Sequence, residues 1–371
     1  MDKEKVKRAA IEYIDSIAGL LKGISRDIHA HPELGGHEFY ASQLLTDIVA
    51  TKSFCIKRNI CEFPTAFVAS KGKGKVPIAF LAEYDALPKI GHACGHNLIA
   101  AMAIGAALAL SSVAEDYFET ALIGCPAEET IGAKVVMAAA GYFDGYRAVF
   151  ITHPGNENYI GGTSYASHPI RITFRGRSAH IAGADRGINA LDALVLFYQG
   201  IKMLQAQCSQ KNIIGGIITQ GGVAPNVVPD IAEAKFSVRA SCSEYLETVL
   251  LPKVRRLGQG VAQMMDASVE MFNYEPLLRE LKQDEQLMEL YIRNMQELGE
   301  KVHQRKPDEA SGSTDVGNVS YRSPTIHPTI YIGAGLEAHT LDFEGAAGAE
   351  YAQERLLIGA KAMVLTAIDV F

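Results

Sequence analysis

The sequence lacks the features that mark most disordered, exported or nucleic-acid-binding chains. It has no low-complexity tract and no long run of like charge, and its 48% hydrophobic and 21% charged residues are ordinary for a globular protein. No basic patch interrupts a formal net charge of −7, so we expect no nucleic-acid partner. The charged N-terminus has no apolar run behind it, which argues against a signal peptide.

Cysteines are few and form no framework. The 6 cysteines are scattered along the chain, and without an export signal they are expected to be reduced thiols in a cytoplasmic protein. The most apolar helix-like run, residues 98–113, is too short to span a bilayer, and its many Ala and Gly residues predict a tightly packed core helix. We therefore expect no membrane association.

The chain is long enough for two domains, because 371 residues exceed the size at which a single hydrophobic core usually stops growing. Short apolar runs that predict buried strands alternate with helical stretches, which favours an α/β layer with a mostly parallel central sheet. In such sheets, ligands gather at the carboxyl ends of the strands. The predicted strands are residues 77–81, 121–125 and 148–151, and the helices between them are residues 98–111 and 133–140.

The pattern changes near residue 166. The order of predicted elements becomes β-α-β-β-α-β, which is typical of a ferredoxin-like α+β unit. After residue 276 the sequence returns to long helices around a short strand. We therefore predict one α/β domain, residues 1–165 and 277–371, interrupted by a smaller inserted domain, residues 166–276.

Two residues suited to metal binding follow the first predicted strand of the α/β layer. Cys94 and His96 are two positions apart in a loop punctuated by glycine, so both side chains can converge on one ion. A thiolate and an imidazole suit zinc or another borderline metal. A buried cysteine beside a helix-capping histidine is the simpler explanation when this pair is considered alone.

Further candidates follow the next two strands. Glu128 and Glu129 are adjacent carboxylates whose repulsion a metal ion would balance, with one ligating and the other accepting a proton. Two solvated glutamates at a helix start explain this pair equally well. His153 ends the third strand, and His339 precedes the last helix. Three loops with metal-type ligands at strand ends together indicate a metal site.

Taken together, these motifs resemble the aminoacylase and carboxypeptidase G superfamily of two-metal peptidases. The similarity is greatest to its amino-acid-conjugate amidohydrolases, which include hippurate, indole-acetyl-amino-acid and p-aminobenzoyl-glutamate hydrolases. The segment 312–318 resembles the sub-branch that handles dipeptides and aminobenzoyl-glutamate. The resembling segments, in family order, are residues 29–35 with Glu38, 85–88, 92–96, 126–129, 178–180, 226–230 and the block around His339.

The resemblance implies a metal-dependent hydrolase that cleaves an amide bond in N-acyl amino acids, dipeptides or aminobenzoyl-glutamate-like conjugates. Glu128 would be the general base, and His180 would stabilise the oxyanion in the active site of a partner subunit. Asn226 and Arg239 would grip polar groups of the substrate, although an ordinary salt bridge explains Arg239 nearly as well. The inserted domain would then serve as a lid and as the dimerisation domain of a homodimer. Two divalent ions (Zn, Mn, Co or Ni) would be bound, and Cys94 would bridge them. The ligands implied by the resemblance are Cys94, His96, Glu129, His153 and His339.

The chain departs from the family pattern at one position near these ligands. Asn97 stands where an aspartate usually follows the Cys-Gly-His motif. Asp85 is expected to support a ligand rather than bind metal, and His327 is a rival to His339 as a ligand. Two other functions stay open: a Cys94-dependent amidase with a nucleophilic thiol, and a catalytically inactive binding protein on the same fold.

Overall fold

The computed structural model describes all residues from 1 to 371, and the chain divides into two compact units. The first unit comprises residues 1–163, 281–309 and 315–371, and the second comprises residues 164–280 and 310–314. We had placed residues 164–165, 277–280 and 310–314 in the first domain, but all three segments belong to the second unit. Within that unit, the backbone N–H of Tyr165 donates to the carbonyl of Gly312 at 2.9 Å.

The first unit is built on a six-stranded sheet with the order β1-β2-β4-β3-β5-β14. β3, β4, β5 and β14 run parallel, whereas β1 and β2 add an antiparallel edge, so the sheet is mixed but mostly parallel as predicted. The strands are β1 (Cys55–Ile60), β2 (Phe63–Lys71), β3 (Val76–Ala82), β4 (Phe118–Gly124), β5 (Ala148–Phe150) and β14 (Thr325–Ile326).

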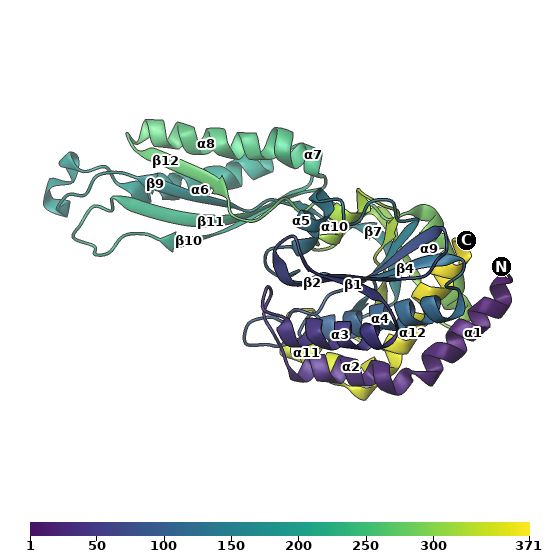
Figure 1. Ribbon diagram of the computed structural model, residues 1–371. Helices are drawn as coiled ribbons and strands as arrows, with labels where there is room; N and C mark the ends of the chain where they lie inside the picture. The colour runs from purple at the N-terminus through teal and green to yellow at the C-terminus, as the bar shows by residue number, and fades with distance from the viewer. The chain divides into compact units, whose positions relative to one another are not determined.

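Helices cover both faces of this sheet (Figure 1). Side chains along β3 alternate between two cores: Phe80 packs with the large helical layer, and its neighbour Leu81 packs with the smaller one, as the two-residue period of a strand requires. The larger layer contains α1 (Lys3–Ser16), α2 (Ala18–Ala30), α3 (Phe39–Thr51), α4 (His96–Val113), α9 (Glu285–Glu297), α11 (Leu341–Gly348) and α12 (Glu350–Asp369). The smaller layer contains α5 (Ala133–Ala139) and α10 (Val316–Ser320).

α4 is the central helix of the larger layer. It is long and apolar enough to cross a membrane, but 89% of the stretch is buried inside the fold, so it serves as the core helix that its composition predicts. A second, four-stranded sheet with the order β13-β7-β15-β6 completes the unit. Its strands are β6 (His153–Gly155), β7 (Tyr159–Thr163), β13 (His303–Ala310) and β15 (Thr329–Tyr331).

The second unit has the ferredoxin-like arrangement that its element order predicts. Its sheet runs β10-β11-β9-β12 with every neighbouring pair antiparallel, and α6 and α8 pack over a separate hydrophobic core (Figure 1). Burial alternates residue by residue along β11, which shows that one face of the sheet carries this core. The elements are β8 (Ala166–Ser167), β9 (Ile170–Arg175), η1 (Ile181–Arg186), α6 (Ala190–Ala206), β10 (Asn212–Gln220), β11 (Ile231–Ala240), α7 (Ser243–Tyr245), η2 (Leu246–Leu250), α8 (Leu251–Met264) and β12 (Ser268–Asn273).

Candidate metal centre and active site

Three neighbouring parallel strands of the first unit end at the same edge of the sheet. β4, β3 and β5 pair in that order and in one direction, so the loops that follow them lie together. Glu83 and Asp85 follow β3, Glu128 and Glu129 follow β4, and His153 follows β5. The parallel pairing thus gathers acidic and imidazole side chains that are far apart in the sequence.

Cys94 and His96 lie where the loop after β3 turns into α4. Gly95 between them has φ of 76°, and a Cβ at this position would lie only 2.5 Å from Cγ of Pro154, so the turn requires glycine. The Cys94 Sγ atom lies 3.3 Å from the His153 Nε2 atom. The turn therefore brings the thiol against an imidazole from the end of β5.

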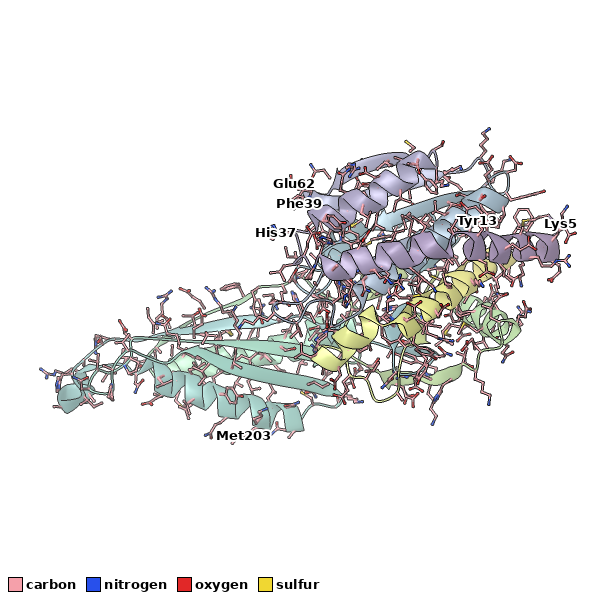
Figure 2. All side chains as sticks on the ribbon, turned by 90° about the horizontal axis from the view of Figure 1, so that it is seen from below. Lys5, Tyr13, His37, Phe39, Glu62 and Met203 are labelled. Carbon is pink, nitrogen blue, oxygen red and sulfur yellow. The ribbon has the colours of Figure 1, made fainter.

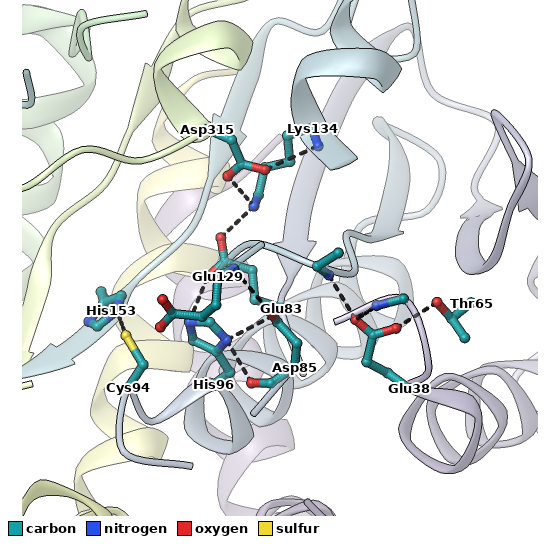
Figure 3. A network of polar contacts seen from close by, with 12 residues as sticks. Glu38, Thr65, Glu83, Asp85, Cys94, His96, Glu129, Lys134, His153 and Asp315 are labelled. Carbon is teal, nitrogen blue, oxygen red and sulfur yellow. Dashed lines mark hydrogen bonds and ion pairs between the residues drawn. The ribbon is translucent and has the colours of Figure 1, made fainter. Parts of the chain in front are cut away.

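Both imidazoles are oriented through their Nδ1 atoms, and Figure 3 shows the contact of His96 with Asp85. His96 Nδ1 lies 2.9 Å from the carbonyl oxygen of Asp85 and 3.0 Å from its Oδ1 atom, and His153 Nδ1 lies 2.7 Å from the carbonyl oxygen of Pro154. Because Nδ1 donates to these oxygens, Nε2 is the ring nitrogen that remains to bind a metal ion. His96 Nε2 is buried and has no hydrogen-bond partner, as expected for a nitrogen that binds a metal ion.

Glu129 is held from two directions. Its backbone N–H donates to Asp85 Oδ2 at 3.0 Å, and its Oε1 atom lies 3.1 Å from His339 Nε2. Burial alone would raise the pKa of Glu129, but the hydrogen bond from His339 and the charges of His96 and His339 lower this pKa to about 2. Asp85 therefore links two candidate ligands, because one oxygen accepts from His96 and the other from the backbone of Glu129.

Glu128 lies in a different electrostatic environment from its neighbour. Burial raises the pKa of the Glu128 carboxyl well above its usual value, and the nearby charges of Glu83 and Asp315 raise it further. Adjacent carboxyls with pKa values displaced in opposite directions are the arrangement expected of a ligand beside a proton acceptor. The positive charge of a bound metal would bring the Glu128 pKa down toward neutral pH.

A buried lysine balances the acidic groups behind Glu128. Lys134 Nζ lies 2.7 Å from Glu83 Oε1 and 2.6 Å from Asp315 Oδ1, and its side chain is fully buried (Figure 3). Burial would lower the pKa of Lys134, but Asp315 and Glu83 raise it well above its usual value, so the ammonium stays charged. The negative charge of Glu83 is therefore balanced by a lysine.

The candidate ligands form two groups that share one sulfur atom. Cys94, His96 and His153 form one group, Cys94, Glu129 and His339 form the other, and the ligand atoms within each group lie within 4.8 Å of one another. Thiolate, imidazole and carboxylate ligands suit zinc and similar divalent ions. The donor set therefore fits two cations, one of which would be held by Cys94, His96 and His153 and the other by Cys94, Glu129 and His339.

The predicted residues of the second unit fall at two different ends of β11. The loops that carry His180 and Asn226 pair directly, since Ile181 N donates to Asn226 O at 3.0 Å. His180 is exposed, and its Nδ1 atom accepts from Ala182 N at 3.1 Å, so Nε2 carries the proton and is free to donate. Arg239 lies near the opposite end of the strand.

Two further polar residues, His327 and Asn97, lie near the candidate ligands. His327 is half-buried with its ring centroid 5.9 Å from that of His153, yet it belongs to neither ligand group. Asn97 donates to Ser25 Oγ at 2.9 Å and to Ala347 O at 3.2 Å, so it ties α2, α4 and α11 together instead of supporting a ligand.

The contacts of Lys134, Asp315 and Glu38 were not predicted from the sequence. Lys134 carried one local signal, because it is the only charged residue of the otherwise apolar α5. Its partner Asp315, and Thr65 and Ala127 which contact Glu38, come from distant parts of the chain, where no local pattern could indicate them.

Comparisons with known proteins agree with this geometry. A family model described as peptidase family M20/M25/M40 matches residues 79–367. The chain is similar to the Xaa-Arg dipeptidase of Mus musculus, with 35% identity over 386 residues, covering 99% of this chain and 89% of that protein. It is also similar to one of the chains of the p-aminobenzoyl-glutamate hydrolase of Escherichia coli, with 32% identity, covering 67% of this chain and 56% of that one.

A solved structure shares the fold. It is that of the YXEP protein of Bacillus subtilis, described as a dinuclear metal-binding peptidase. The TM-score is 0.72 at 23% sequence identity, and the match covers 96% of this chain and 99% of that chain.

Proposed function

Because the chain belongs to peptidase family M20/M25/M40, we propose that this hydrolase of C–N bonds cleaves the amide bond of dipeptides and related N-acyl amino acids. The observation that carries the proposal is the convergence of five metal-type ligands beside Glu128. Four of them follow β3, β4 and β5, and His339 lies in the loop before α11. A binding protein would have no use for a carboxyl poised to exchange protons at this place.

Two divalent ions would be held by the two ligand groups that share Cys94. When bound, they would supply the positive charge that lowers the pKa of water and polarises an amide carbonyl. Glu128 accepts the proton of the attacking water and later donates it to the departing amine nitrogen. Asp85 keeps His96 and Glu129 in position throughout, because it holds both with one carboxylate.

Residues of the second unit complete the reaction. The exposed Nε2–H of His180 donates to the developing oxyanion, with Asn226 beside it. The guanidinium of Arg239 binds the substrate carboxylate through paired charge-assisted hydrogen bonds. Full-length similarity to Xaa-Arg dipeptidases makes dipeptides the leading substrate class, with C-terminal arginine among the first residues to test.

The spacing along β11 supports a homodimer. At about 3.3 Å per residue, the strand from 231 to 239 separates Arg239 from the His180 end by about 26 Å. A dipeptide is far shorter than this. One copy of the second unit can therefore contact a given substrate either through Arg239 or through His180 and Asn226, but not through both. Two copies would supply both, with His180 and Asn226 acting in the partner's active site.

The second unit also offers an apolar edge for such pairing. β10 ends the sheet, and its Ile217 is 65% exposed. α6 lies against this strand, since Tyr198 Oη donates a hydrogen bond to Gly216 O. Met203 on α6 is also 65% exposed (Figure 2). An unpaired apolar edge strand next to an apolar helix face suits association with an identical edge.

A cysteine-nucleophile amidase is less well supported. Burial raises the pKa of the Cys94 thiol, whereas a nucleophilic cysteine needs a lowered pKa. A chelator separates the two mechanisms, since it would leave a thiol-dependent activity intact and abolish a metal-dependent one.

The decisive experiment compares Glu128→Gln with Glu129→Gln. Glu128→Gln should keep both metal ions and lose at least about a hundredfold in kcat, because only the proton acceptor is removed. Glu129→Gln should lose metal, because a ligand is removed. Metal content is measured alongside hydrolysis of dipeptides, N-acyl amino acids and aminobenzoyl-glutamate, with Zn, Mn, Co and Ni supplied in turn. Undiminished turnover in Glu128→Gln would remove this residue from its role.

A further inference from the structure

Glu38 is a completely buried carboxylate in the first unit, at the residue before α3. It does not cap its own helix. Its Oε1 atom instead accepts from Gly36 N at 2.9 Å and from Ala127 N at 2.8 Å, and its Oε2 atom accepts from Thr65 Oγ1 at 2.8 Å (Figure 3). A buried carboxylate is costly unless hydrogen bonds satisfy it, so these contacts fix where the group sits.

Ala127 is the residue directly before Glu128, and it has an unusual backbone. Its φ is 59°, in the left-handed region that a residue with a Cβ adopts only at an energetic cost. Its N–H donates to Glu38, and its carbonyl accepts from Gly132 N at 2.8 Å. Hydrogen bonds on both sides thus hold the peptide groups of a strained turn.

The segment before Glu38 packs against the same turn. A Cβ at Gly35 would lie 3.0 Å from the Ala127 Cα and 2.5 Å from Thr130 Oγ1, so this segment approaches the turn as closely as glycine allows. The backbone conformation of Ala127 determines the direction in which the next two side chains point. If the turn relaxed, Glu128 and Glu129 would both be redirected.

We infer that Glu38 is a positioning residue for the active site: its carboxylate holds Ala127 in the left-handed conformation that aims Glu128 at the reacting water. This inference rests on the proposed role of Glu128. The hydrogen-bond partners of Glu38 are Gly36, Thr65 and Ala127, none of which is a candidate metal ligand. It acts only through the backbone of Ala127.

The same loop provides a matched control. Glu33 also accepts two backbone hydrogen bonds, from Tyr40 N at 2.9 Å and from Ala41 N at 3.0 Å, at the start of α3. Neither bond involves the turn at Ala127. Glu33→Gln therefore makes the same chemical change in the same loop without disturbing the turn.

The first measurement is hydrogen exchange of the metal-free protein, which requires no activity. Glu38→Gln should speed amide exchange in the peptide covering residues 124–132, whereas Glu33→Gln should leave that peptide unchanged. Equal exchange in the two variants would overturn the inference. This result stands whether or not the protein hydrolyses any of the proposed substrates, so it separates the two proposals.

The second measurement is the kinetic effect in the metal-loaded protein. Glu38→Gln should lower kcat at least about tenfold with KM within about twofold, because the proton acceptor is misaligned while substrate binding is kept. Glu33→Gln should keep kcat within about twofold. A loss of kcat in Glu33→Gln as large as that in Glu38→Gln would overturn the inference.

A second substitution distinguishes positioning from general stabilisation. Glycine adopts a positive φ freely, so adding Ala127→Gly to Glu38→Gln should recover about fivefold in kcat. Failure of Ala127→Gly to recover any activity would contradict the role of Glu38.

If Glu38→Gln does not fold, Thr65→Val and Thr65→Ser replace it. Loss of the hydroxyl that holds Glu38 should lower kcat at least about threefold relative to serine, and equal rates would refute the inference.

Discussion

Replacing Lys134 by methionine removes a buried cation from between two carboxylates while keeping a side chain of similar length. The ammonium lies 2.7 Å from Glu83 Oε1 and 2.6 Å from Asp315 Oδ1, and all three side chains are almost completely buried. Removing one partner of a buried ion pair leaves an uncompensated charge and typically costs about 3–5 kcal/mol. We therefore expect Lys134→Met to lower the free energy of unfolding of the metal-free protein by about this amount.

The loss of unfolding free energy caused by Lys134→Met should grow as pH rises. Burial works to raise the pKa of Glu83, but the charge and hydrogen bond of Lys134, together with the charges of His96 and His327, lower it to about 2. Burial raises the pKa of Asp315 to about 6 even with Lys134 present. Without the lysine, the pKa values of Glu83 and Asp315 in the folded state both rise. Above about pH 4 the folded state therefore binds more protons than the unfolded state. Stability of the variant then falls as pH rises, and its deficit should be larger at pH 8 than at pH 5.

Urea unfolding followed by circular dichroism measures this difference, provided the slope of the transition is unchanged. Lys22→Met is a matched control, because Lys22 also pairs with two carboxylates, Glu350 and Glu354, but both are largely exposed. Screening by water should keep its cost below about 1 kcal/mol. Equal costs for the two variants, or a deficit for Lys134→Met that grows as pH falls, would refute the reasoning.

Two more outcomes follow from the contacts of the site. Asp85→Asn should weaken metal affinity by about 10–100-fold, because an amide cannot accept hydrogen bonds from both His96 and the backbone of Glu129. Competition with a chelator measures the affinity, and an unchanged value would contradict the supporting role of Asp85. Mixing Glu128→Gln and His180→Ala subunits, each inactive alone, should restore about a quarter of wild-type activity if His180 acts in the partner's site, since random pairing leaves one in four sites intact. No recovery after subunit exchange would place His180 outside the partner's site.

Periodic and compositional signals predicted the main elements of the fold. The uniformly apolar run near residue 100 became the buried α4, and the short apolar runs became β3, β4 and β5. Breaks between consecutive helices were less visible. The apolar residues keep a helical spacing across Ile17, which separates α1 from α2, and across Ala349, which separates α11 from α12. Single residues with non-helical backbone angles leave the apolar period almost unchanged.

The candidate ligands could be named in advance because each occupies a short motif directly after a predicted strand. Strand direction then brings such loops to one edge of the sheet, so Cys94, Glu129 and His153 could be expected to meet. The domain boundary was less predictable. Residues 310–314 return to the second unit through a backbone hydrogen bond to Tyr165, and backbone pairing of this kind leaves no mark on residue type.

The amino-acid sequence by itself determined the residue types of the site, the strand-end loops that carry them and the two-unit architecture. Only the tertiary structure decided which groups support them: Glu38 behind Ala127, Asp85 between two ligands, and Lys134 between Glu83 and Asp315. The reason is physical. Helix and strand periods arise from neighbours along the chain, whereas a buried charge is satisfied by whatever the completed fold places within about 3 Å of it, often from far away in the sequence.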